Sequence, residues 1–585
     1  MLAPTTLAAI RIAAVGLALA AGCLAQQTPV ILISIDTLRA DHLSAYGYTK
    51  IRTPNIDALS QQGTVFTAID SQIPLTLPSH TSLFTSTYPF ANGIEENGQR
   101  LPDGAVTLAS VLRAHGYQTA AFVGSVLLDR RTGIAQGFDT YDSPFHLPEG
   151  GGENPYGVRV RRDGALVVRA ARQWLEAHRN QPVFAFLHFF DLHTPYSVAP
   201  GPDALPRTAG YDAELAYIDR LLGGFRQALV AEGWWDRSLV VLLSDHGESL
   251  GDHGETSHGY FIYQSTVWVP LIVHWPAGKL KLAARVTQPG GLIDVAPMIL
   301  DFLGVPRPPS FSGESLLQTS ASHIVYSEST YTRDAFGWAP LRSLRDTTFQ
   351  YIEAPKPELY NLQADPQETN NLASIDAGPG RPLRDQLDRL IMRFAPHSGA
   401  NAASSQTNAL LGSLGYVGSG PHIARSGPMP DPKDRLPEYD VYETALAALY
   451  AGNPAGAIRD LRGLLKDDPQ NTLAHYYVGE AYLRAHQSES AVREWTATLK
   501  TDPTYVPAEE ALAEVWMARE DYARARGYYQ QALAAAPLDF TALLGAGIAE
   551  KHLGMLPEAR KHLEAACAID PESTRCRNEL AGVGR

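Results

Sequence analysis

The first two thirds of the chain contain short, mostly apolar runs separated by longer amphipathic segments. Three runs, at 30–35, 183–190 and 239–244, are rich in apolar residues but only six to eight residues long. That length favours buried parallel strands over helices. Segments such as 106–115 and 164–178 have the spacing of helices. Strands that alternate with helices predict an α/β fold with a mostly parallel central sheet flanked by helices.

Each predicted strand is followed by an acidic residue. These residues are Asp36, Asp191 and Asp245, and His246 lies directly after Asp245. The carboxyl ends of parallel strands meet at one edge of a sheet, where α/β proteins bind their ligands. Carboxylates together with an imidazole are typical ligands of a divalent cation. The sequence therefore predicts a metal site formed by Asp36, Asp245 and His246.

The segment 74–85, rich in Pro, Thr and Ser, leads into a predicted apolar helix and contains Thr76. The N-terminus of a helix favours an oxyanion such as phosphate or sulfate. A threonine hydroxyl becomes a useful nucleophile when a metal ion or a nearby base lowers its pKa. Thr76 is therefore the candidate nucleophile and a further metal ligand. The alternative is that Thr76 only caps the helix.

The pattern changes after residue 395. Residues 396–437 are rich in Gly, Ser, Ala and Pro and are predicted to form a linker between a domain at 28–395 and a repeat region at 438–585. In the repeat region, three columns recur every 34 residues, which is the period of about four tetratricopeptide repeats, an all-α solenoid. The columns are Pro469, Pro503, Pro537 and Pro571; Ala457, Ala491, Ala525 and Ala559; and Ala445, Gly479, Ala513 and Gly547. Such arrays usually offer a groove to a protein partner. The alternatives are that the repeats dimerise the protein or support the first domain.

Residues 1–25 have the features of an export signal, with Arg11 followed by a short apolar run. The sequence before Cys23 resembles a lipoprotein signal, in which Cys23 would carry a lipid, although Ala20 replaces the usual Leu. The alternative is ordinary cleavage after Ala25. Both interpretations place the mature chain in a periplasm, with membrane contact only through the lipid.

Composition narrows the functional classes. The net charge is −14, from 48 basic and 62 acidic residues, which argues against nucleic-acid binding because phosphate backbones require clustered Lys and Arg. Three cysteines are too few for a disulfide scaffold or Cys-rich zinc modules. Cys567 and Cys576 could form one disulfide in an oxidising compartment or remain two thiols.

Several of these segments together resemble the sulfatase branch of the alkaline phosphatase superfamily. The matching segments are 36–41, 76–85, 191–196 and 244–248, and then 358–372, which resembles the small C-terminal subdomain with its short antiparallel sheet. The resemblance covers residues 28–395 and implies a metal-dependent hydrolase that acts on anionic esters. A sulfatase-like domain followed by repeats resembles a recurrent bacterial arrangement.

The resemblance also implies roles for residues outside the strand ends. His193 and His258 lie where the family places groups that contact the transferring oxyanion, so both join Thr76 as candidate catalytic residues. Either could donate a proton, or the two could hold a second metal ion with Asp191. Asn97, Arg39 and His80 are the candidate substrate-binding residues. Arg39 could instead pair with Asp41, and His80 could orient Thr76.

One departure from the family determines the expected chemistry. Sulfatases carry Cys or Ser in the motif Cys-x-Pro-Ser-Arg and oxidise that residue to formylglycine, whereas this chain has Thr76-Leu77-Pro78-Ser79-His80. Threonine cannot form that aldehyde because its Cβ bears a methyl group. Related enzymes with a threonine nucleophile act on phosphodiesters or phosphoanhydrides. We therefore expect a phosphoric ester hydrolase or transferase, with Zn²⁺ or Mn²⁺ favoured over Ca²⁺ because His246 is a ligand. The alternatives are a sulfatase that lacks formylglycine and a non-enzymatic scaffold with a decayed hydrolase domain.

Overall fold

The structure is a computed structural model, and it describes most of the chain. The described residues are 27–145, 161–194, 196, 210–280, 282–318, 323–373, 378, 380–394, 428–571 and 573–583. The predicted export signal at 1–25 and most of the predicted linker therefore lie outside the described residues.

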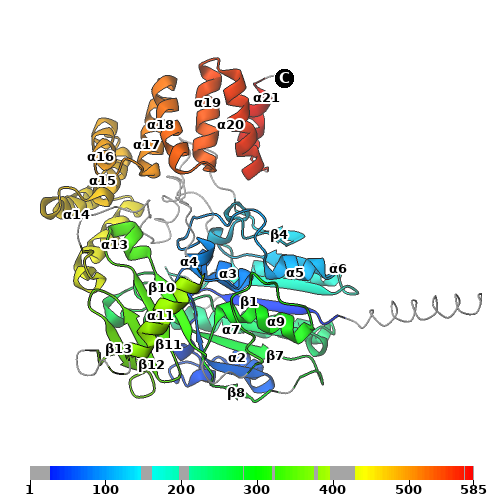
Figure 1. The fold of residues 1–585 in the computed structure, drawn as a ribbon. Helices are drawn as coiled ribbons and strands as arrows, with labels where there is room; N and C mark the ends of the chain where they lie inside the picture. The colour runs from blue at the N-terminus through cyan, green and yellow to red at the C-terminus, as the bar shows by residue number, and fades with distance from the viewer. Residues whose placement is uncertain are drawn as a thin grey trace, which may run out of the picture.

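A nine-stranded mixed sheet forms the centre of the first domain (Figure 1). Strand order is β4-β3-β5-β1-β6-β7-β2-β8, and β9 also pairs with β2. The five strands from β4 to β6 are parallel, and β7 runs antiparallel to both of its neighbours. The bounds are β1 Val30–Ile35, β2 Thr64–Asp70, β3 Gln118–Phe122, β4 Thr140–Asp142, β5 Val183–Phe189, β6 Leu239–Leu243, β7 Trp268–His274, β8 Arg285–Val286 and β9 Gly290–Gly291. The three predicted strands are confirmed within one residue of their predicted ends.

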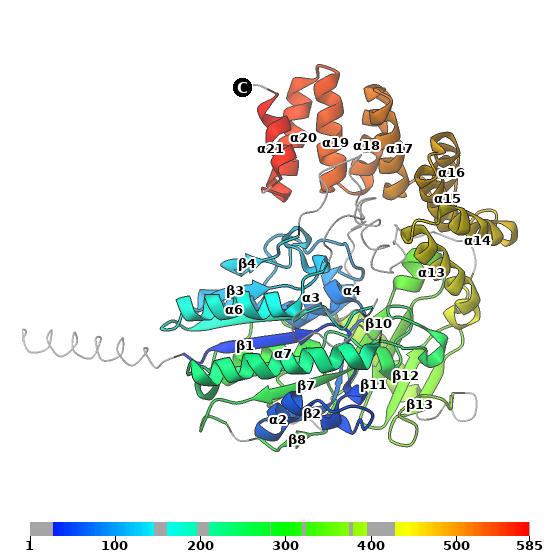
Figure 2. The same cartoon turned by 180° about the vertical axis from the view of Figure 1, so that it is seen from behind.

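Helices cover both faces of this sheet because the side chains of a fully buried strand alternate between them. In β1, Val30 and Leu32 face one core, and Ile31, Ile33 and Ile35 face the other. The first core also contains α3 Thr76–Thr85, α5 Leu108–Ala114 and α9 Val295–Leu303. The second contains α2 Pro54–Gln62, α6 Gly164–Ala177 and α7 Tyr211–Ala231. Figure 2 shows α6 and α7 in front of the sheet. Short helices are α4 Pro89–Asn92, α8 Gln264–Val267 and α10 Tyr331–Phe336.

A separate antiparallel sheet completes the first domain. Its strands are β10 Val325–Ser329, β11 Leu341–Arg345, β12 Phe349–Glu353 and β13 Glu358–Asn361. The amphipathic helix α11 Gly380–Phe394 packs Leu383, Leu387 and Leu390 against this sheet. The expected small C-terminal subdomain is thus present.

The repeat region consists of antiparallel helix pairs followed by a last short helix. Its helices are α13 Leu436–Tyr450, α14 Pro454–Asp467, α15 Thr472–Arg484, α16 Ser488–Thr501, α17 Val506–Ala518, α18 Tyr522–Ala535, α19 Phe540–His552, α20 Leu556–Ile569 and α21 Thr574–Ala581. Each proline of the 34-residue column follows the second helix of a pair by two residues. A Cβ at Gly479 would lie 2.4 Å from the Trp495 ring, so close helix packing requires glycine there. A disulfide joins Cys567 in α20 to Cys576 in α21.

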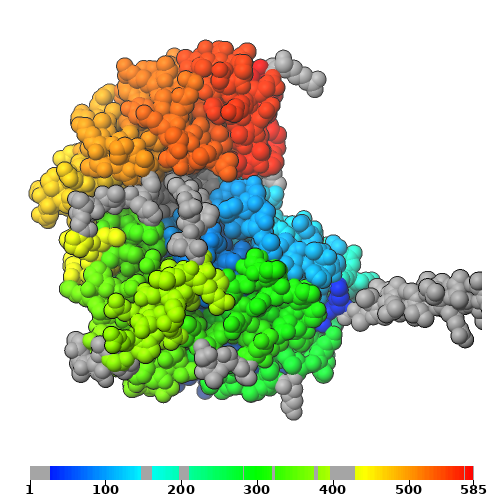
Figure 3. Space-filling model, in the orientation of Figure 1, coloured from blue at the N-terminus to red at the C-terminus, as the bar shows by residue number. Residues whose placement is uncertain are grey.

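The repeats pack against the first domain. Figure 3 shows the yellow start of the array in contact with the green part of the first domain. At its other end, Asp570 lies 3.9 Å from the Arg131 guanidinium of the first domain. Among the described helices, none combines the length and the apolar character that a bilayer crossing needs.

Candidate active site

The carboxyl ends of β1 and β6 bring Asp36 and Asp245 together. The two strands are parallel neighbours, and Ser34 pairs with Leu243, so the residues that follow them leave the sheet at one edge. Thr37 joins the two ends because its amide donates to Asp245 Oδ1 at 3.3 Å. Thr37 has a φ of +56°, which costs energy for a β-branched residue. Such strain is characteristic of functional sites, and sequence analysis missed this residue.

Thr76 is the first residue of α3 and points toward the same edge. The residue at the N-cap position is Leu75, whose side chain makes no capping hydrogen bond, and Thr76 is the first helical residue, so the alternative that Thr76 is only a cap is wrong. Thr76 Oγ1 lies 3.3 Å from Asp36 Oδ2 and 3.5 Å from His246 Nε2. The Thr76 side chain is fully buried. The structure therefore brings together all four residues predicted to hold a cation.

The ionised forms of these two carboxyl groups are disfavoured in this buried environment unless a positive charge lies nearby. Burial raises the pKa of Asp36, and burial together with the nearby Asp36 raises the pKa of Asp245. Within the described part of the chain, Asp36 Oδ1 and Asp245 Oδ2 are buried and have no hydrogen-bond partner. One ligand atom each from Asp36, Asp245 and His246 lies within 4.8 Å of the others. A divalent cation fits this set because it would neutralise both acids and use their unpaired oxygens.

The tautomer of His246 also suits a metal ligand. His246 Nδ1 lies 2.9 Å from the carbonyl oxygen of Gly247, which can only accept, so Nδ1 carries the hydrogen. This leaves the lone pair on Nε2, the atom that faces Thr76 and Asp245. Burial lowers the pKa of His246, so the ring is neutral. A hydrogen bond from the far nitrogen is the usual support of a metal-binding imidazole.

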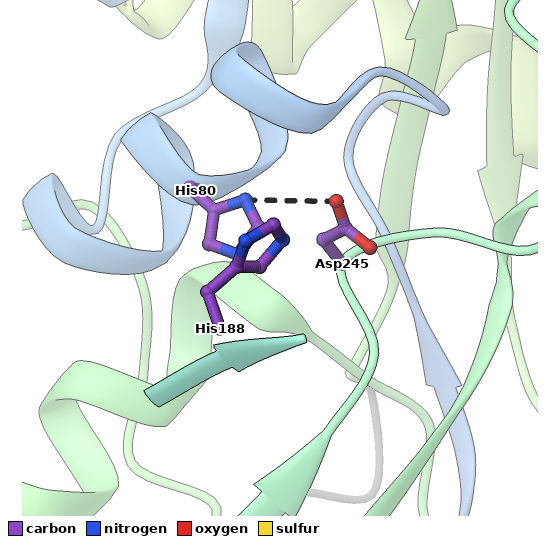
Figure 4. Close-up of side chains that lie close together, drawn as sticks. All are labelled: His80, His188 and Asp245. Carbon is purple, nitrogen blue, oxygen red and sulfur yellow. Dashed lines mark ion pairs between the residues drawn. The ribbon is translucent and has the colours of Figure 1, made fainter. Parts of the chain in front are cut away.

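His80 lies one turn after Thr76 along α3. Figure 4 shows its ring close to His188 and facing Asp245. Its Nδ1 lies 2.7 Å from the Thr76 carbonyl oxygen and 3.6 Å from Asp245 Oδ2, and its Nε2 lies 2.9 Å from Ser34 Oγ. Nδ1 must therefore carry a hydrogen, and both ring nitrogens are used by the protein. Although His80, His188 and Asp245 lie close enough to share an ion, this hydrogen prevents Nδ1 from coordinating one. His80 is placed to orient Thr76.

His188 is a further histidine at this site, and it is not among the residues that the sequence analysis identified. It lies on β5, fully buried, with Nε2 3.3 Å from Asp36 Oδ2 and its ring edge-on to His80. Burial lowers the pKa of His188 to about 3, so it is neutral. One signal was available in the sequence, because a histidine inside an apolar strand needs a polar partner.

We expect His188→Phe to weaken cation binding about 10- to 100-fold, since groups that orient metal ligands have effects of that size. The aromatic ring keeps the packing, so the folded structure should persist. Titration of the chelator-treated protein with Zn²⁺ or Mn²⁺ measures the change. The matched control is His274→Phe. His274 is a buried residue of β7 whose ring stacks on Trp235. Equal affinities in both variants would reduce His188 to a packing role.

His193 and His258 lie beside the cation ligands. The rings of His246 and His258 are 4.4 Å apart, and those of His193 and His258 are 5.1 Å apart and perpendicular. His193 Nδ1 donates to the Thr194 carbonyl at 2.6 Å, and His258 Nδ1 lies 3.1 Å from Glu248 Oε1. Burial lowers the pKa of both, that of His258 to about 3. An anionic substrate would favour the protonated forms, which are the proton donors.

Asn97 is held at the N-terminus of α3, where it contacts the residue after Thr76. Its Oδ1 accepts from the Leu77 amide at 2.9 Å, which fixes the side chain at the N-terminus of α3. Its Nδ2 is buried and has no hydrogen-bond partner among the described residues. A buried donor without a partner is costly, and a bound oxyanion would satisfy it.

Arg39 binds protein groups on several sides. Its guanidinium makes a two-point contact with Asp41 at 2.8 and 2.9 Å and an ion pair with Asp252 at 2.9 Å. It also donates to the carbonyl oxygens of Glu248 and Ser249, each at 3.1 Å. Of the two roles open to it, the structure shows the pairing with Asp41.

Asp191 is directed toward α6. Its Oδ1 accepts from the Gly164 amide at 3.0 Å, and its Oδ2 is buried without a hydrogen-bond partner among the described residues. This position at the start of α6 gives Asp191 a helix-terminal role.

The environment of Asp191 predicts a pH-dependent stability. Burial raises its pKa to about 7, above the ordinary value of 3.8. A raised folded-state pKa contributes stability at low pH that is lost as pH rises from about 4 to about 7, at about 1.4 kcal/mol per pH unit. Asp191→Asn stays neutral, so its stability relative to wild type should rise across this window and level off above it. Urea midpoints by tryptophan fluorescence measure this. Exposed Asp385→Asn is the control and should show no such trend.

Comparison with known families agrees with this architecture. The model of the sulfatase family matches residues 28–305, and the C-terminal model of N-sulphoglucosamine sulphohydrolase matches residues 251–392. A tetratricopeptide repeat model matches residues 442–505 and 510–574. The matches follow the two parts of the fold.

Individual relatives cover the first domain. An ulvan-active sulfatase of Formosa agariphila is 25% identical over 416 residues, covering 61% of this chain and 79% of the relative. The multifunctional alkaline phosphatase superfamily protein PehA of Trinickia caryophylli is 26% identical over 499 residues, covering 63% of this chain and 95% of the relative. The phosphonate monoester hydrolase structure of Agrobacterium radiobacter has a TM-score of 0.52 and 22% identity, covering 63% and 96%, and shares the fold. Residues 28–305 therefore form a domain that matches the sulfatase family, and tetratricopeptide repeats follow this domain.

Proposed function

We propose that the chain is a metal-dependent hydrolase or transferase of phosphoric esters that uses Thr76 as its nucleophile. The observation that carries this proposal is the position of Thr76 Oγ1, at the N-terminus of α3 and 3.3 Å from Asp36 Oδ2. Threonine cannot become formylglycine, which removes the nucleophile that sulfatases use. A relative described as multifunctional within the alkaline phosphatase superfamily supports this choice.

Asp36, Asp245, His246 and Thr76 would hold the cation. When bound, a divalent cation supplies charge neutralisation and lowers the pKa of a bound hydroxyl. The donor set of two carboxylates, one imidazole and one hydroxyl favours Zn²⁺ or Mn²⁺, with Ca²⁺ the alternative.

The residues of the chain account for the remaining steps. The Thr76 hydroxyl gives up its proton to solvent, and Oγ forms a bond to phosphorus while the bond from phosphorus to the leaving oxygen breaks. His258 or His193, once protonated, gives its proton to that oxygen. Asn97 Nδ2 and the N-terminus of α3 stabilise charge on the non-bridging oxygens. Water or an acceptor hydroxyl then attacks phosphorus and gives its proton to the same imidazole, while the bond from phosphorus to Thr76 Oγ breaks. This second step decides between hydrolysis and transfer.

A substrate panel tests the proposal. The substrates p-nitrophenyl phosphate, bis-p-nitrophenyl phosphate, p-nitrophenyl phenylphosphonate and p-nitrophenyl sulfate all release p-nitrophenolate, so differences in rate report on the reacting centre. We expect kcat/KM to be highest for a phosphorus ester. A preference for the sulfate would contradict the proposal.

The second candidate is a sulfatase that works without formylglycine. It is favoured by the relatives named as sulfatases, including the ulvan-active enzyme. The third, a decayed scaffold, is disfavoured by the intact arrangement of Asp36, Asp245, His246 and Thr76. Metal analysis of the purified protein separates it from the enzymes, because a decayed site has no reason to retain an ion.

We further propose that the chain is exported and that the repeats bind a protein partner. The Cys567–Cys576 disulfide supports export, because disulfides persist in oxidising compartments such as the periplasm. Cell fractionation tests the location, and a Cys23→Ala variant tests the lipid anchor.

A further inference from the structure

The repeat region contacts the loop that carries His258. This loop, residues 248–263, begins at Glu248 and ends at Tyr263, and we call it the His258 loop. Thr256 Oγ1, two residues before His258, donates to Glu443 Oε2 of α13 at 2.6 Å. Tyr260, two residues after His258, lies with its ring 4.5 Å from that of Tyr439 in α13. Contacts with the first repeat helix therefore flank His258 on both sides.

Further contacts hold the same surfaces together. The Tyr260 hydroxyl donates to the Pro432 carbonyl at 2.6 Å, just before α13. The Tyr439 hydroxyl donates to Glu443 Oε1 at 2.8 Å, which orients the carboxylate that receives Thr256. At Gly254, where φ is +84°, a Cβ would lie 2.5 Å from Leu436 Cδ2 of α13. The loop and α13 are therefore in close contact at Gly254.

The hydrophobic core crosses this boundary. Tyr260 and Trp338 of the first domain belong to one buried cluster with Tyr439 and Tyr442 of α13, and the cluster continues into the next repeats. These tyrosines are at most 2% exposed. Domains joined by a linker usually move relative to each other unless their interface is large and apolar. This interface is an aromatic core, so α13 is fixed against the loop.

Hydrogen bonds within the His258 loop connect its contacts with α13 to His258 itself. Its two arms are joined by the Ser249 amide, which donates to the Ser257 carbonyl at 2.8 Å. Glu255 accepts from the amides of Tyr260 and Phe261 at 2.9 and 3.1 Å. His258 Nδ1 contacts Glu248, and its ring lies against His246. The position of the imidazole therefore depends on the loop as a unit.

We infer that α13 is a structural part of the active site, with Tyr439 and Glu443 acting as positioning residues for His258. The first repeat is then required for catalysis itself, in addition to any partner that the array binds. This inference rests on the proposed function, because it assigns His258 the transfer of a proton to the leaving group.

Proton donation provides a specific readout in the full-length protein. A poor leaving group such as an alkoxide needs the proton, whereas p-nitrophenolate hardly does. We expect Glu443→Leu and Tyr439→Ala to lower kcat about 10- to 100-fold for a methyl ester, because a small misplacement of a catalytic group costs about that much. For the p-nitrophenyl ester, which hardly needs the proton, kcat should fall less than about 3-fold. Tyr439→Phe keeps the ring and should restore most of the methyl-ester rate. Glu489→Leu, at an exposed position in α16, is the matched control.

Hydrogen exchange tests the same inference without using activity. Exchange should rise in peptides from 248–263 in Glu443→Leu and remain unchanged in peptides from α3. An unchanged leaving-group dependence in both variants would overturn the inference, whether or not exchange rises. Thr76→Ala distinguishes the two proposals. If Thr76→Ala stays active, the nucleophile assignment fails, while the exchange and leaving-group comparisons still decide the role of α13.

Discussion

Thr76→Ala should abolish turnover, lowering kcat by at least about 10³-fold, as expected when a covalent nucleophile is removed. The variant should fold, because Thr76 neither caps α3 nor fills a large volume. It should also bind a cation, since Asp36, Asp245 and His246 remain. Steady-state rates with the preferred ester, together with metal content, measure both effects.

Two comparisons make this result specific. Thr85→Ala removes a hydroxyl at the other end of α3, where Thr85 donates to the Thr81 carbonyl, and should keep full activity. Thr76→Ser keeps the nucleophilic oxygen and should retain measurable activity. A Thr76→Ala enzyme with substantial turnover would exclude a covalent intermediate on this residue.

Asp245→Asn should lower cation affinity by more than about 100-fold. The loss of a charged ligand should cost more than the loss of a group that only orients a ligand, which costs about 10- to 100-fold. Activity should fall with it. Asp245→Asn should stabilise the fold when the cation is absent and destabilise it, relative to wild type, when the cation is bound. In the chelator-treated protein, burial and the nearby Asp36 raise the pKa of Asp245, so a neutral amide should stabilise the fold. With the cation bound, wild type should be the more stable protein.

Thermal unfolding with and without chelator measures this crossover. Exposed Asp385→Asn provides the control and should show the same shift on cation addition as wild type. If Asp245→Asn and wild type respond equally to Zn²⁺ and Mn²⁺, the carboxylate does not bind the ion. A stability difference of one sign under both conditions would contradict the charge argument.

The sequence alone was enough to identify the strands and the repeats, because both leave a regular pattern of residues along the chain. The apolar run at 30–35 identified β1, and the strand end identified Asp36 as a residue of the ligand-binding edge. The 34-residue columns identified the repeats because each column marks a position where two helices must touch, as Gly479 and Trp495 do. These features depend on neighbours close in the chain.

The tertiary structure decided which polar groups face one another. His188 lies 152 residues from Asp36, and Glu443 lies 187 residues from Thr256, so no local pattern could pair them. Arg39 could serve substrate or Asp41 equally well in the sequence, and only the fold places it among protein acceptors. The sequence alone determined the elements and the acidic strand ends, because apolar periodicity is a local property of the chain. Partners, tautomers and the contact between α13 and the His258 loop depend on packing between distant segments, and only the folded chain fixes them.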